Sequence, residues 1–509
     1  MMRLRAWIPA NLFGALVQRG MYPYCIIVRN WIRLRNEQKE SVELAKTPIL
    51  DALMEMVRQL RVPLHVPGHK QGRMLPAELA AWLGQAGRLD LTELPGLDNL
   101  HQPEECILHS QRLAAEYYGS QHCFYSVNGS SAAVMAAICS VAAGRKILLA
   151  GPFHQSAWRG IVLADAEPVI LPTSFHRALH RPNPPAVADV AAELAKHPDC
   201  AAVFVTSPNY QGAVADVAAL ADVCHRAGVP LVVDEAHGAH FGLIPELPPH
   251  SVAAGADVVI HSAHKMLPAL TQTAWVHVTG PRVDAETLQR WLLTFQTTSP
   301  SYLLLASLDA AQAWLRSDGP RAAAEALAVV RDAGIVVAGQ TGVDPLRHWL
   351  PTSGLSESLA VQAALADAGI QVEMADGQGV LAVFGFGIRP REAERYMEIV
   401  RQTVSEVPPE AREDEAAWSL PALAPDFACR PRAAYGQAMA WVPLAEAEGR
   451  TAGVMVTPYP PGTPLIVPGQ RLDAAAVATL RALLAQHVHI HGMRGDRVGV
   501  LCHSGAATG

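Results

Sequence analysis

Residues 231–238 read Leu-Val-Val-Asp-Glu-Ala-His-Gly, and residues 258–265 read Val-Val-Ile-His-Ser-Ala-His-Lys. These two stretches decide the fold, because each is an apolar run that leads into a chemically active group, Asp234 or Lys265. A lysine amine can form a Schiff base with an aldehyde, and a carboxylate can face a pyridine nitrogen and keep it protonated. A buried Asp and Lys often simply pair with each other. In this order and at this spacing they favour a site for the cofactor pyridoxal phosphate (PLP).

The surrounding sequence predicts an α/β fold, because short apolar runs alternate with Ala-rich helical stretches. Strands that are apolar throughout indicate a mainly parallel sheet with helices on both faces. In such a sheet ligands bind at the carboxyl ends of the strands, where Asp234 and the Ser262–Lys265 segment fall. The expected strands are 123–127, 146–150, 168–171, 202–206, 231–234, 258–261 and 274–278. The expected helices include 49–60, 131–143, 186–196, 217–227 and 301–315. Two further strands are expected near 371–374 and 380–384.

Composition and charge narrow the class of protein. A chain of 509 residues is too long for one compact core, so two or three domains are expected. The net charge of −7 is mild, with no basic stripe for nucleic acid and no polybasic patch for a membrane. The eight cysteines show no Cys-x-x-Cys spacing, which favours reduced core cysteines in a cytoplasmic enzyme. The sequence contains no cluster of metal ligands, and no metal is expected.

The first 46 residues differ from the rest. Residues 1–5 are basic and residues 6–17 are apolar, but Pro9 and Asn11 interrupt the apolar run. A secretory signal has a cleaner apolar run, and a bilayer span needs a longer one. We therefore expect a poorly ordered extension or a start codon placed too far upstream, since Met21 is available. An amphipathic surface helix at residues 26–35 is the alternative.

A second group of candidate residues is Asn128-Gly129-Ser130-Ser131, between a predicted strand and a long predicted helix. Small hydroxyl residues and free backbone N–H groups at a helix N-terminus form an anion site, although an ordinary N-cap is the alternative. With a Schiff-base lysine downstream, the cofactor phosphate is the natural occupant. Ser262 and His264 could add contacts to it.

Two histidines are expected near the same edge of the sheet. His154 follows the next predicted strand, where its imidazole could stack on a pyridine ring and help to position protons. His237, three residues after Asp234, could orient that carboxylate or touch the cofactor. The alternatives are a solvated loop histidine for His154 and a satisfied core histidine for His237.

In these motifs the chain resembles the bacterial Orn/Lys/Arg decarboxylase family, which has the aspartate-aminotransferase-like PLP fold. It is most similar to the shorter members, which lack an N-terminal receiver-like domain. The match runs from about Thr47 to about Arg494. The segments that carry it are Leu64-His65-Val66-Pro67-Gly68-His69-Lys70, Leu97-Asp98-Asn99-Leu100-His101, Gly129-Ser130-Ser131, Asp234 to His240, Ser262-Ala263-His264-Lys265, Thr297 to Leu304, Tyr459 to Pro464 and Pro468-Gly469.

The resemblance implies a role for each candidate residue. Lys265 would carry the internal aldimine, Asp234 would bind the ring nitrogen and His154 would stack on the ring. His264 or Lys265 could return a proton to the substrate α-carbon after CO₂ leaves. Thr298 would come from the partner subunit of an obligate homodimer and complete the neighbour's phosphate site. The remaining cofactor contacts would be made by Gly129, Ser130, Ser131, Ala236, His237, Ser262 and His264.

The predicted elements and a Pro-containing acidic stretch give the domain organisation, and the resemblance implies the reaction. The chain would comprise an extension (1–46), a PLP-binding major domain (47–317), a small α/β domain (318–407), a linker (408–425) and a C-terminal α+β domain (426–509). The enzyme would decarboxylate arginine, lysine or ornithine to the corresponding amine. Its partners would be the amino-acid substrate and a second copy of the chain, with no nucleic acid and no membrane.

Two differences from the family pattern bear on the substrate, and two alternative functions bear on the reaction. Gln470 stands where relatives usually carry Glu, and the segment around His154 lacks their basic residues. An aminotransferase or lyase on the same fold would need an arginine to grip the α-carboxylate, and Arg389 and Arg391 are the candidates for it. A non-enzymatic regulator is the second alternative, although the retention of Lys265 and Asp234 argues against it.

Overall fold

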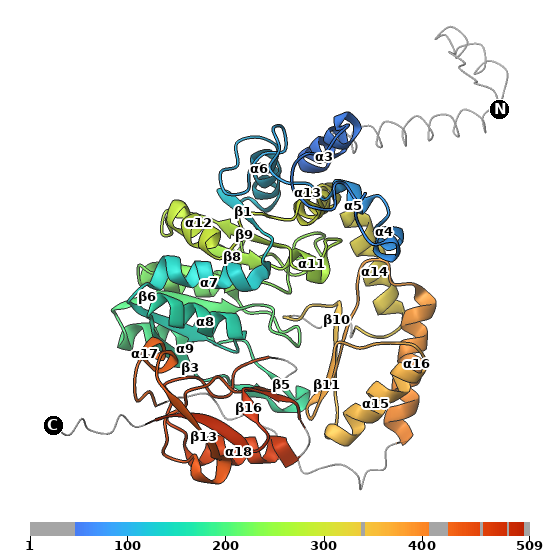
Figure 1. Ribbon diagram of the computed structural model, residues 1–509. Coiled ribbons are helices and arrows are strands. Elements are labelled where there is room, and N and C mark those ends of the chain that lie inside the picture. The colour runs from blue at the N-terminus through green and yellow to red at the C-terminus, as the bar shows by residue number, and fades with distance from the viewer. Residues whose placement is uncertain (1–45, 337–341, 407–425, 459–461, 486–487, 503–509) are drawn as a thin grey trace.

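The computed structural model describes residues 46–336, 342–406, 426–458, 462–485 and 488–502. Its centre is a seven-stranded sheet in the order β1-β9-β8-β7-β6-β2-β3 (Figure 1). Strand β9 runs antiparallel to its neighbours β1 and β8, and the other neighbouring pairs are parallel. The predicted mainly parallel sheet is therefore confirmed. The strands are β1 (His122–Ser126), β2 (Lys146–Ala150), β3 (Glu167–Leu171), β6 (Cys200–Thr206), β7 (Leu231–Asp234), β8 (Val258–His261) and β9 (Ala274–Val278).

Alternate residues of these strands face two different cores, because side chains on a strand point to opposite faces of the sheet. Val232 belongs to one core, and its neighbours Leu231 and Val233 belong to the other. The first core lies under α7 (Gly129–Ala142), α8 (Gln155–Ala164) and α12 (Ala285–Thr294). The second lies under α3 (Pro48–Gln59), α6 (Cys106–Tyr118), α9 (Val187–Lys196), α10 (Val217–Arg226) and α13 (Tyr302–Arg316). Burial on both faces explains why the strands are mainly apolar.

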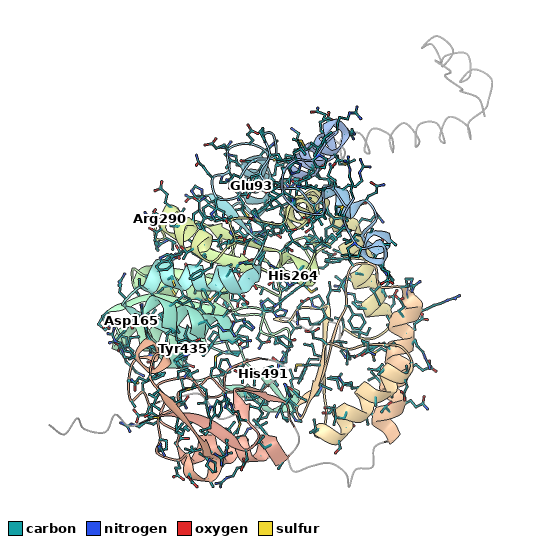
Figure 2. All side chains as sticks on the ribbon, viewed as in Figure 1. Glu93, Asp165, His264, Arg290, Tyr435 and His491 are labelled. Carbon is teal, nitrogen blue, oxygen red and sulfur yellow. The ribbon has the colours of Figure 1, made fainter. Side chains whose placement is uncertain are left out.

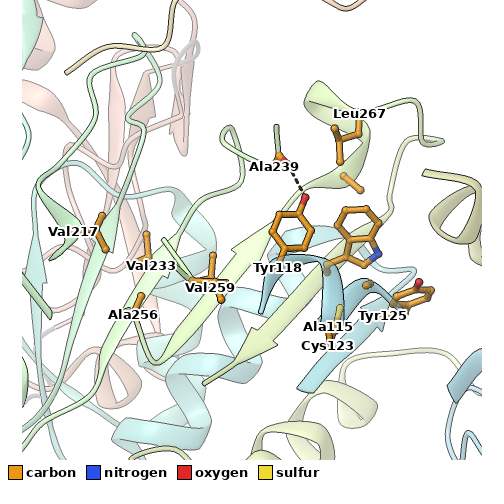
Figure 3. Packing of buried hydrophobic residues seen from close by; sticks show 14 of the residues in the cluster. Ala115, Tyr118, Cys123, Tyr125, Val217, Val233, Ala239, Ala256, Val259 and Leu267 are labelled. Atoms are coloured by element: carbon orange, nitrogen blue, oxygen red, sulfur yellow. Dashed lines mark hydrogen bonds between the residues drawn. The ribbon is translucent and has the colours of Figure 1, made fainter. Parts of the chain in front are cut away.

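Tyr118 shows how the second core is closed near the end of the sheet (Figure 3). Its ring packs at 4.8 Å from His261 and 4.7 Å from His277, measured between ring centroids. Its hydroxyl donates a hydrogen bond of 2.6 Å to the carbonyl of Ala239, in the loop after β7. This contact fixes the loop that follows Asp234 against the helical layer.

A small domain follows the major one. A three-stranded sheet, in the order β10 (Arg347–Pro351), β12 (Gly379–Val383) and β11 (Met374–Asp376), packs with α14 (Gly319–Asp332), α15 (Leu355–Asp367) and α16 (Pro390–Glu406) on a core of its own. The strand predicted near 380–384 is confirmed. The strand predicted near 371–374 is present but shifted, because β11 begins only at Met374 and residues 371–373 lie in the preceding loop. Val372 packs against the small core from the preceding loop, so its apolar character does not reflect a strand.

The C-terminal part forms a core of its own around β13 (Met439–Pro443), β16 (Met493–Arg494), β17 (Arg497–Leu501) and α18 (Ala474–Ala485). The C-terminal part contacts the major domain through Phe427, whose ring stacks on that of Trp158 at 5.8 Å between ring centroids. In Figure 1 the small domain (orange) and the C-terminal part (red) lie on neighbouring sides of the large sheet. The domain boundaries proposed from the sequence stay predictions, since the linker 408–425 and residues 1–45 lie outside the described residues.

The described part of the chain contains seven cysteines, and all of them are free thiols. Burial raises the pKa of Cys123 and Cys224 above the ordinary value, the latter to about 12, so these thiols behave as inert core residues. None of the described helices combines the length and the apolar character that a membrane crossing needs.

Candidate active site

A cavity of about 690 Å³ lies at the carboxyl edge of the large sheet. Residues that end or follow the parallel strands line it, together with Arg347, Glu373 and Asp376 of the small domain and Thr463 to Leu465 of the C-terminal part. Figure 2 shows His264 near the middle of the molecule, between the large sheet and the small domain. The cavity brings together nine of the predicted residues: Gly129, Ser130, Ser131, His154, Asp234, Ala236, His237, His264 and Lys265.

Asp234 is the last residue of β7 and is 4% exposed. Its Oδ1 accepts a hydrogen bond of 3.2 Å from the backbone N–H of Ala236. Burial raises the pKa of the Asp234 carboxyl group above its ordinary value, while the nearby amine of Lys265 pulls it down. A carboxylate that is withdrawn from water in this way is stabilised by a cation placed against it.

Lys265 lies in α11 (Ala263–Met266), a short helix that begins where β8 ends. Its side chain opens into the cavity, yet protein atoms surround it on most sides and keep bulk water away. This loss of solvation lowers the pKa of the amine to about 8, although Asp234 acts in the opposite direction. The neutral, nucleophilic amine is therefore far more abundant near neutral pH than in an ordinary lysine.

Two of the candidate phosphate-binding residues, Ser262 and Ser130, are connected by a hydrogen bond between their hydroxyl groups. Ser262, which precedes α11 and is fully buried, donates a hydrogen bond of 2.7 Å to the hydroxyl oxygen of Ser130. Ser130 and Ser131 lie in the first turn of α7, a helix of 14 residues whose N-terminus faces the cavity. Free N–H groups and the helix dipole at this end favour an anion. Ser262 itself does not line the cavity but holds Ser130 in place.

His154 and His264 line the cavity with defined ring orientations. Nδ1 of His154 accepts a hydrogen bond of 3.2 Å from the N–H of Ser156 and thereby caps α8. Although the ring is open to the cavity, its separation from bulk water and the charge of Lys265 lower its pKa to about 4. Nδ1 of His264 lies 2.8 Å from the carbonyl oxygen of Thr273 and must donate to it. Burial lowers the pKa of His264, so the neutral ring leaves Nε2 free to accept a proton.

Arg347 is a residue of this site that the sequence did not reveal. It begins β10, and its guanidinium is buried against the cavity wall. It donates one hydrogen bond of 2.7 Å to the carbonyl of Tyr210 and another to Nδ1 of His237. Lys265 Nζ lies 3.0 Å from Nε2 of the same histidine.

Two other predictions concern residues outside this cavity. Thr298 is exposed and does not line the cavity of its own chain, so its contribution to a partner's site stays a prediction. Gln470 is buried, and its side-chain oxygen accepts a hydrogen bond of 3.1 Å from Val467 N. It does not line the cavity either, so its difference from Glu alters no contact there.

The arginines considered for an aminotransferase are not in position. Arg389 is 78% exposed and pairs with Glu392 on the surface of α16, and Arg391 is exposed on the same helix. Neither lines the cavity, so the hypothesis that one of them grips a substrate carboxylate is wrong for this chain. Residues 459–461 of the C-terminal motif lie outside the described residues, whereas Thr463 and Pro464 of that motif line the cavity.

The residues around the cavity fit PLP. The buried carboxylate of Asp234 suits a protonated ring nitrogen, and the lowered pKa of Lys265 suits attachment to an aldehyde. The N-terminus of α7 with Ser130 suits a phosphate. In the described part of the chain no group of three or more His, Cys, Asp or Glu residues could hold a metal ion.

Comparison with known families agrees with this geometry. Residues 47–353 match the family model described as the Orn/Lys/Arg decarboxylase major domain, and residues 411–507 match that of its C-terminal domain. An arginine decarboxylase of Bacillus subtilis (strain 168) is 31% identical over 448 residues, which cover 84% of this chain and 91% of that protein. The lysine decarboxylase LdcA of Pseudomonas aeruginosa is 25% identical over 563 residues, covering 85% of this chain and 75% of that one.

Two solved structures share the fold. The constitutive lysine decarboxylase of Escherichia coli superimposes with a TM-score of 0.75 at 19% identity, over 92% of this chain and 84% of that chain. Lysine decarboxylase A of Pseudomonas aeruginosa gives a TM-score of 0.75 at 22% identity, over 94% of this chain and 83% of that chain. The expected aspartate-aminotransferase-like fold, with its small and C-terminal parts, is thus confirmed.

Proposed function

Because the chain belongs to the Orn/Lys/Arg decarboxylase family, we propose that it removes the carboxylate of a basic amino acid as CO₂, with PLP as its cofactor. The observation that carries the proposal is the arrangement of Asp234 and Lys265 on one cavity. Burial raises the pKa of the carboxyl group, so a cation such as a protonated ring nitrogen beside it would stabilise the carboxylate, and burial lowers the pKa of the amine, which favours its attack on an aldehyde. Titratable groups with opposed environments are typical of catalytic sites.

Lys265 would hold the cofactor covalently, and Ser130, Ser131 and the N-terminus of α7 would hold its phosphate. When bound, PLP supplies a conjugated ring that accepts the electron pair left behind by CO₂. Asp234 would keep the ring nitrogen protonated, and the low-dielectric surroundings of this carboxylate strengthen that interaction. Gly129, Ala236 and His154 would position the ring.

The substrate carbon must gain a proton after CO₂ leaves, and Lys265 would be its donor. With a pKa of about 8, the side chain released by the substrate is mostly an ammonium group near neutral pH and can give up a proton. Nε2 of His264 is unprotonated, because Nδ1 donates to Thr273, so this ring would first have to take up a proton before it could deliver one. The cavity walls restrict bulk water, which favours delivery of the proton from one of these side chains.

The charges of the cavity support a cationic substrate. Apart from Asp234, the carboxylates of Glu373 and Asp376 line it, both from the small domain. Burial raises the pKa of Asp376 to about 6, so this group would gain from a cation beside it. Arginine is the substrate to test first, since several relatives at about 30% identity are arginine decarboxylases.

The proposal includes a homodimer in the cytoplasm with shared active sites. The support for sharing is that the 297–299 segment is exposed in one chain, so Thr298 is available to a neighbouring subunit. The free cysteines of the described residues fit a reducing compartment. Sedimentation velocity would show a dimer, and a Thr298→Ala variant would bind PLP more weakly if the site is shared.

Substrate and reaction are tested together. Purified protein with PLP is incubated separately with arginine, lysine and ornithine, and CO₂, amine and keto acid are measured. We expect CO₂ and one of agmatine, cadaverine or putrescine, and none from a Lys265→Ala variant. Keto acid without CO₂ would favour an aminotransferase instead. Unchanged substrate in all three reactions would contradict the assignment to basic amino acids.

A further inference from the structure

A continuous chain of polar contacts leads from Lys265 into the small domain. Nζ of Lys265 lies 3.0 Å from Nε2 of His237, and Nδ1 of His237 is bonded to the Arg347 guanidinium. Nε of Arg347 lies 3.7 Å from Oδ2 of Asp344, whose Oδ1 lies 3.1 Å from Nε2 of His240. His237 and His240 follow β7, whereas Asp344 precedes β10 of the small domain and Arg347 begins that strand. These four residues are all buried.

The chemistry of the donors fixes the direction of these hydrogen bonds. A guanidinium group can only donate, so Nδ1 of His237 must accept from Arg347 and cannot carry a hydrogen. A neutral imidazole carries one hydrogen, which must then be on Nε2. Burial and the charge of Arg347 lower the pKa of His237 well below its ordinary value, so the ring is neutral. Nε2–H therefore donates, and its partner Nζ of Lys265 must accept.

An ammonium group has no lone pair and cannot accept a hydrogen bond. We propose that Arg347 fixes His237 in the Nε2–H tautomer, and that His237 thereby favours the neutral amine of Lys265 over its ammonium form before the cofactor arrives. Asp344, which is itself bonded to His240, keeps Arg347 in position from the opposite side. Arg347 and His240 are thus positioning residues that act through His237 and Asp344 rather than on the substrate.

The charged groups around Lys265 would not by themselves favour its neutral form. The carboxylates of Asp234 and Glu373 favour the ammonium form of Lys265. The charge of Arg347 and the burial of the amine away from water oppose that form. The remaining titratable neighbours are His154, His237 and His264, and burial lowers the pKa of each of them. Two carboxylates would therefore favour the ammonium form if His237 were free to accept from it. The fixed tautomer removes that acceptor.

The neutral state of Lys265 is inferred from the structure alone. Only its consequence, that the protein is ready to bind PLP, rests on the proposed function. A neutral amine can attack at once: its lone pair forms a bond to the aldehyde carbon, and the aldehyde oxygen leaves as water with the two amine hydrogens. An ammonium group would first have to lose a proton. The state of Lys265 in the protein without cofactor can be measured independently of any activity.

The test measures the pKa of Lys265 in the cofactor-free protein. The rate at which acetic anhydride acetylates Nζ is followed against pH by mass spectrometry of the peptide that contains Lys265. The wild-type pKa should be near 8. Arg347→Met and His237→Phe should each raise it by about one unit or more, which lowers the neutral fraction at pH 7 about tenfold. Glu373→Gln should shift it downward, because it removes a carboxylate that favours the ammonium form.

The double variant separates the hydrogen-bonded relay from simple charge repulsion. If Arg347 acts through His237, adding Arg347→Met to His237→Phe should change the Lys265 pKa by less than a third of the shift seen alone. The same shift in both backgrounds would overturn the proposal, since it would mean that Arg347 acts only through its charge. No shift in either background would overturn it as well.

A second measurement uses the unaltered protein, because loss of the buried Arg347 could prevent folding. In cofactor-free protein labelled with ¹⁵N-histidine, the His237 signals are identified by their absence from His237→Phe. We expect the Nδ1 resonance to have the shift of an unprotonated nitrogen and Nε2 that of a protonated one. The reverse tautomer, or a doubly protonated ring, would overturn the proposal.

Discussion

Replacing Asp234 with Asn tests the electrostatic role of this carboxylate with little change of shape. The amide oxygen of Asn can keep the hydrogen bond from Ala236 N, which the carboxylate now accepts at 3.2 Å. The variant should therefore fold, while the buried negative charge at the end of β7 is lost. We expect one consequence in the cofactor-free protein and another in the protein with PLP bound.

In the protein without cofactor, the pKa of Lys265 should fall below about 8, because Asp234 favours the ammonium form. In the protein with PLP, the ring nitrogen should no longer be held protonated. Removing one preorganised electrostatic contact typically lowers kcat by about 10²- to 10³-fold, or about 3–4 kcal/mol. We expect a loss of this size, because Asp234 is only 4% exposed and solvent cannot take its place.

The assay is CO₂ release under saturating PLP, combined with acetylation of Lys265 in the cofactor-free protein. Asp309→Asn is the matched control, since it removes another buried carboxylate that lies on α13, outside the cavity. The control should leave both the Lys265 pKa and kcat close to wild type. A kcat for Asp234→Asn within tenfold of wild type would refute the proposed role of Asp234.

Three further predictions concern the phosphate site, a close contact and pH. Ser130→Ala should raise the Kd for PLP about tenfold or more, as loss of a hydrogen bond to a charged group predicts. Ser140→Ala, further along the same helix, should not change the Kd in an absorbance titration. Gly238→Ala should lower the free energy of unfolding by about 1–3 kcal/mol, since its Cβ would lie 2.7 Å from Cγ of Glu235. Gly436→Ala, with no atom within 4 Å of the added Cβ, should give no comparable loss in urea unfolding. The folded pKa of Asp309 is raised to about 6, so its contribution to stability is full below pH 3.8 and is lost as the pH rises through 6. Relative to wild type, Asp309→Asn should therefore gain roughly 2 kcal/mol of unfolding free energy between pH 4 and 7. A constant difference between the two proteins over that range would contradict this assignment.

The large sheet was predictable because each of its long strands can be recognised in the sequence without knowledge of its neighbours. β2, β7, β8 and β9 begin and end where the sequence predicts, since each is an apolar run flanked by polar or turn residues. The hairpin of β4 (Phe175–His176) and β5 (Arg181–Pro182) was not predicted, because two-residue strands show no periodicity. It nevertheless reaches the cavity through Phe175 and His180.

The site was predictable only where its residues follow predicted strands. Asp234 and Lys265 lie at strand ends, so the rule for parallel sheets placed them together. Arg347 begins a strand that contains His348 and was not expected, and its partner His237 is 110 positions away. A buried arginine can be recognised only when the group that it pairs with is known, and that pairing depends on how the two domains meet.

The measurement that tests the central claim most directly is the mapping of PLP on the protein. Protein loaded with PLP is treated with borohydride, digested and analysed by mass spectrometry. The account predicts one phosphopyridoxyl group per chain, attached to Lys265 and lost in Lys265→Ala. Attachment at another lysine, or no stable attachment in the wild-type protein, would contradict it.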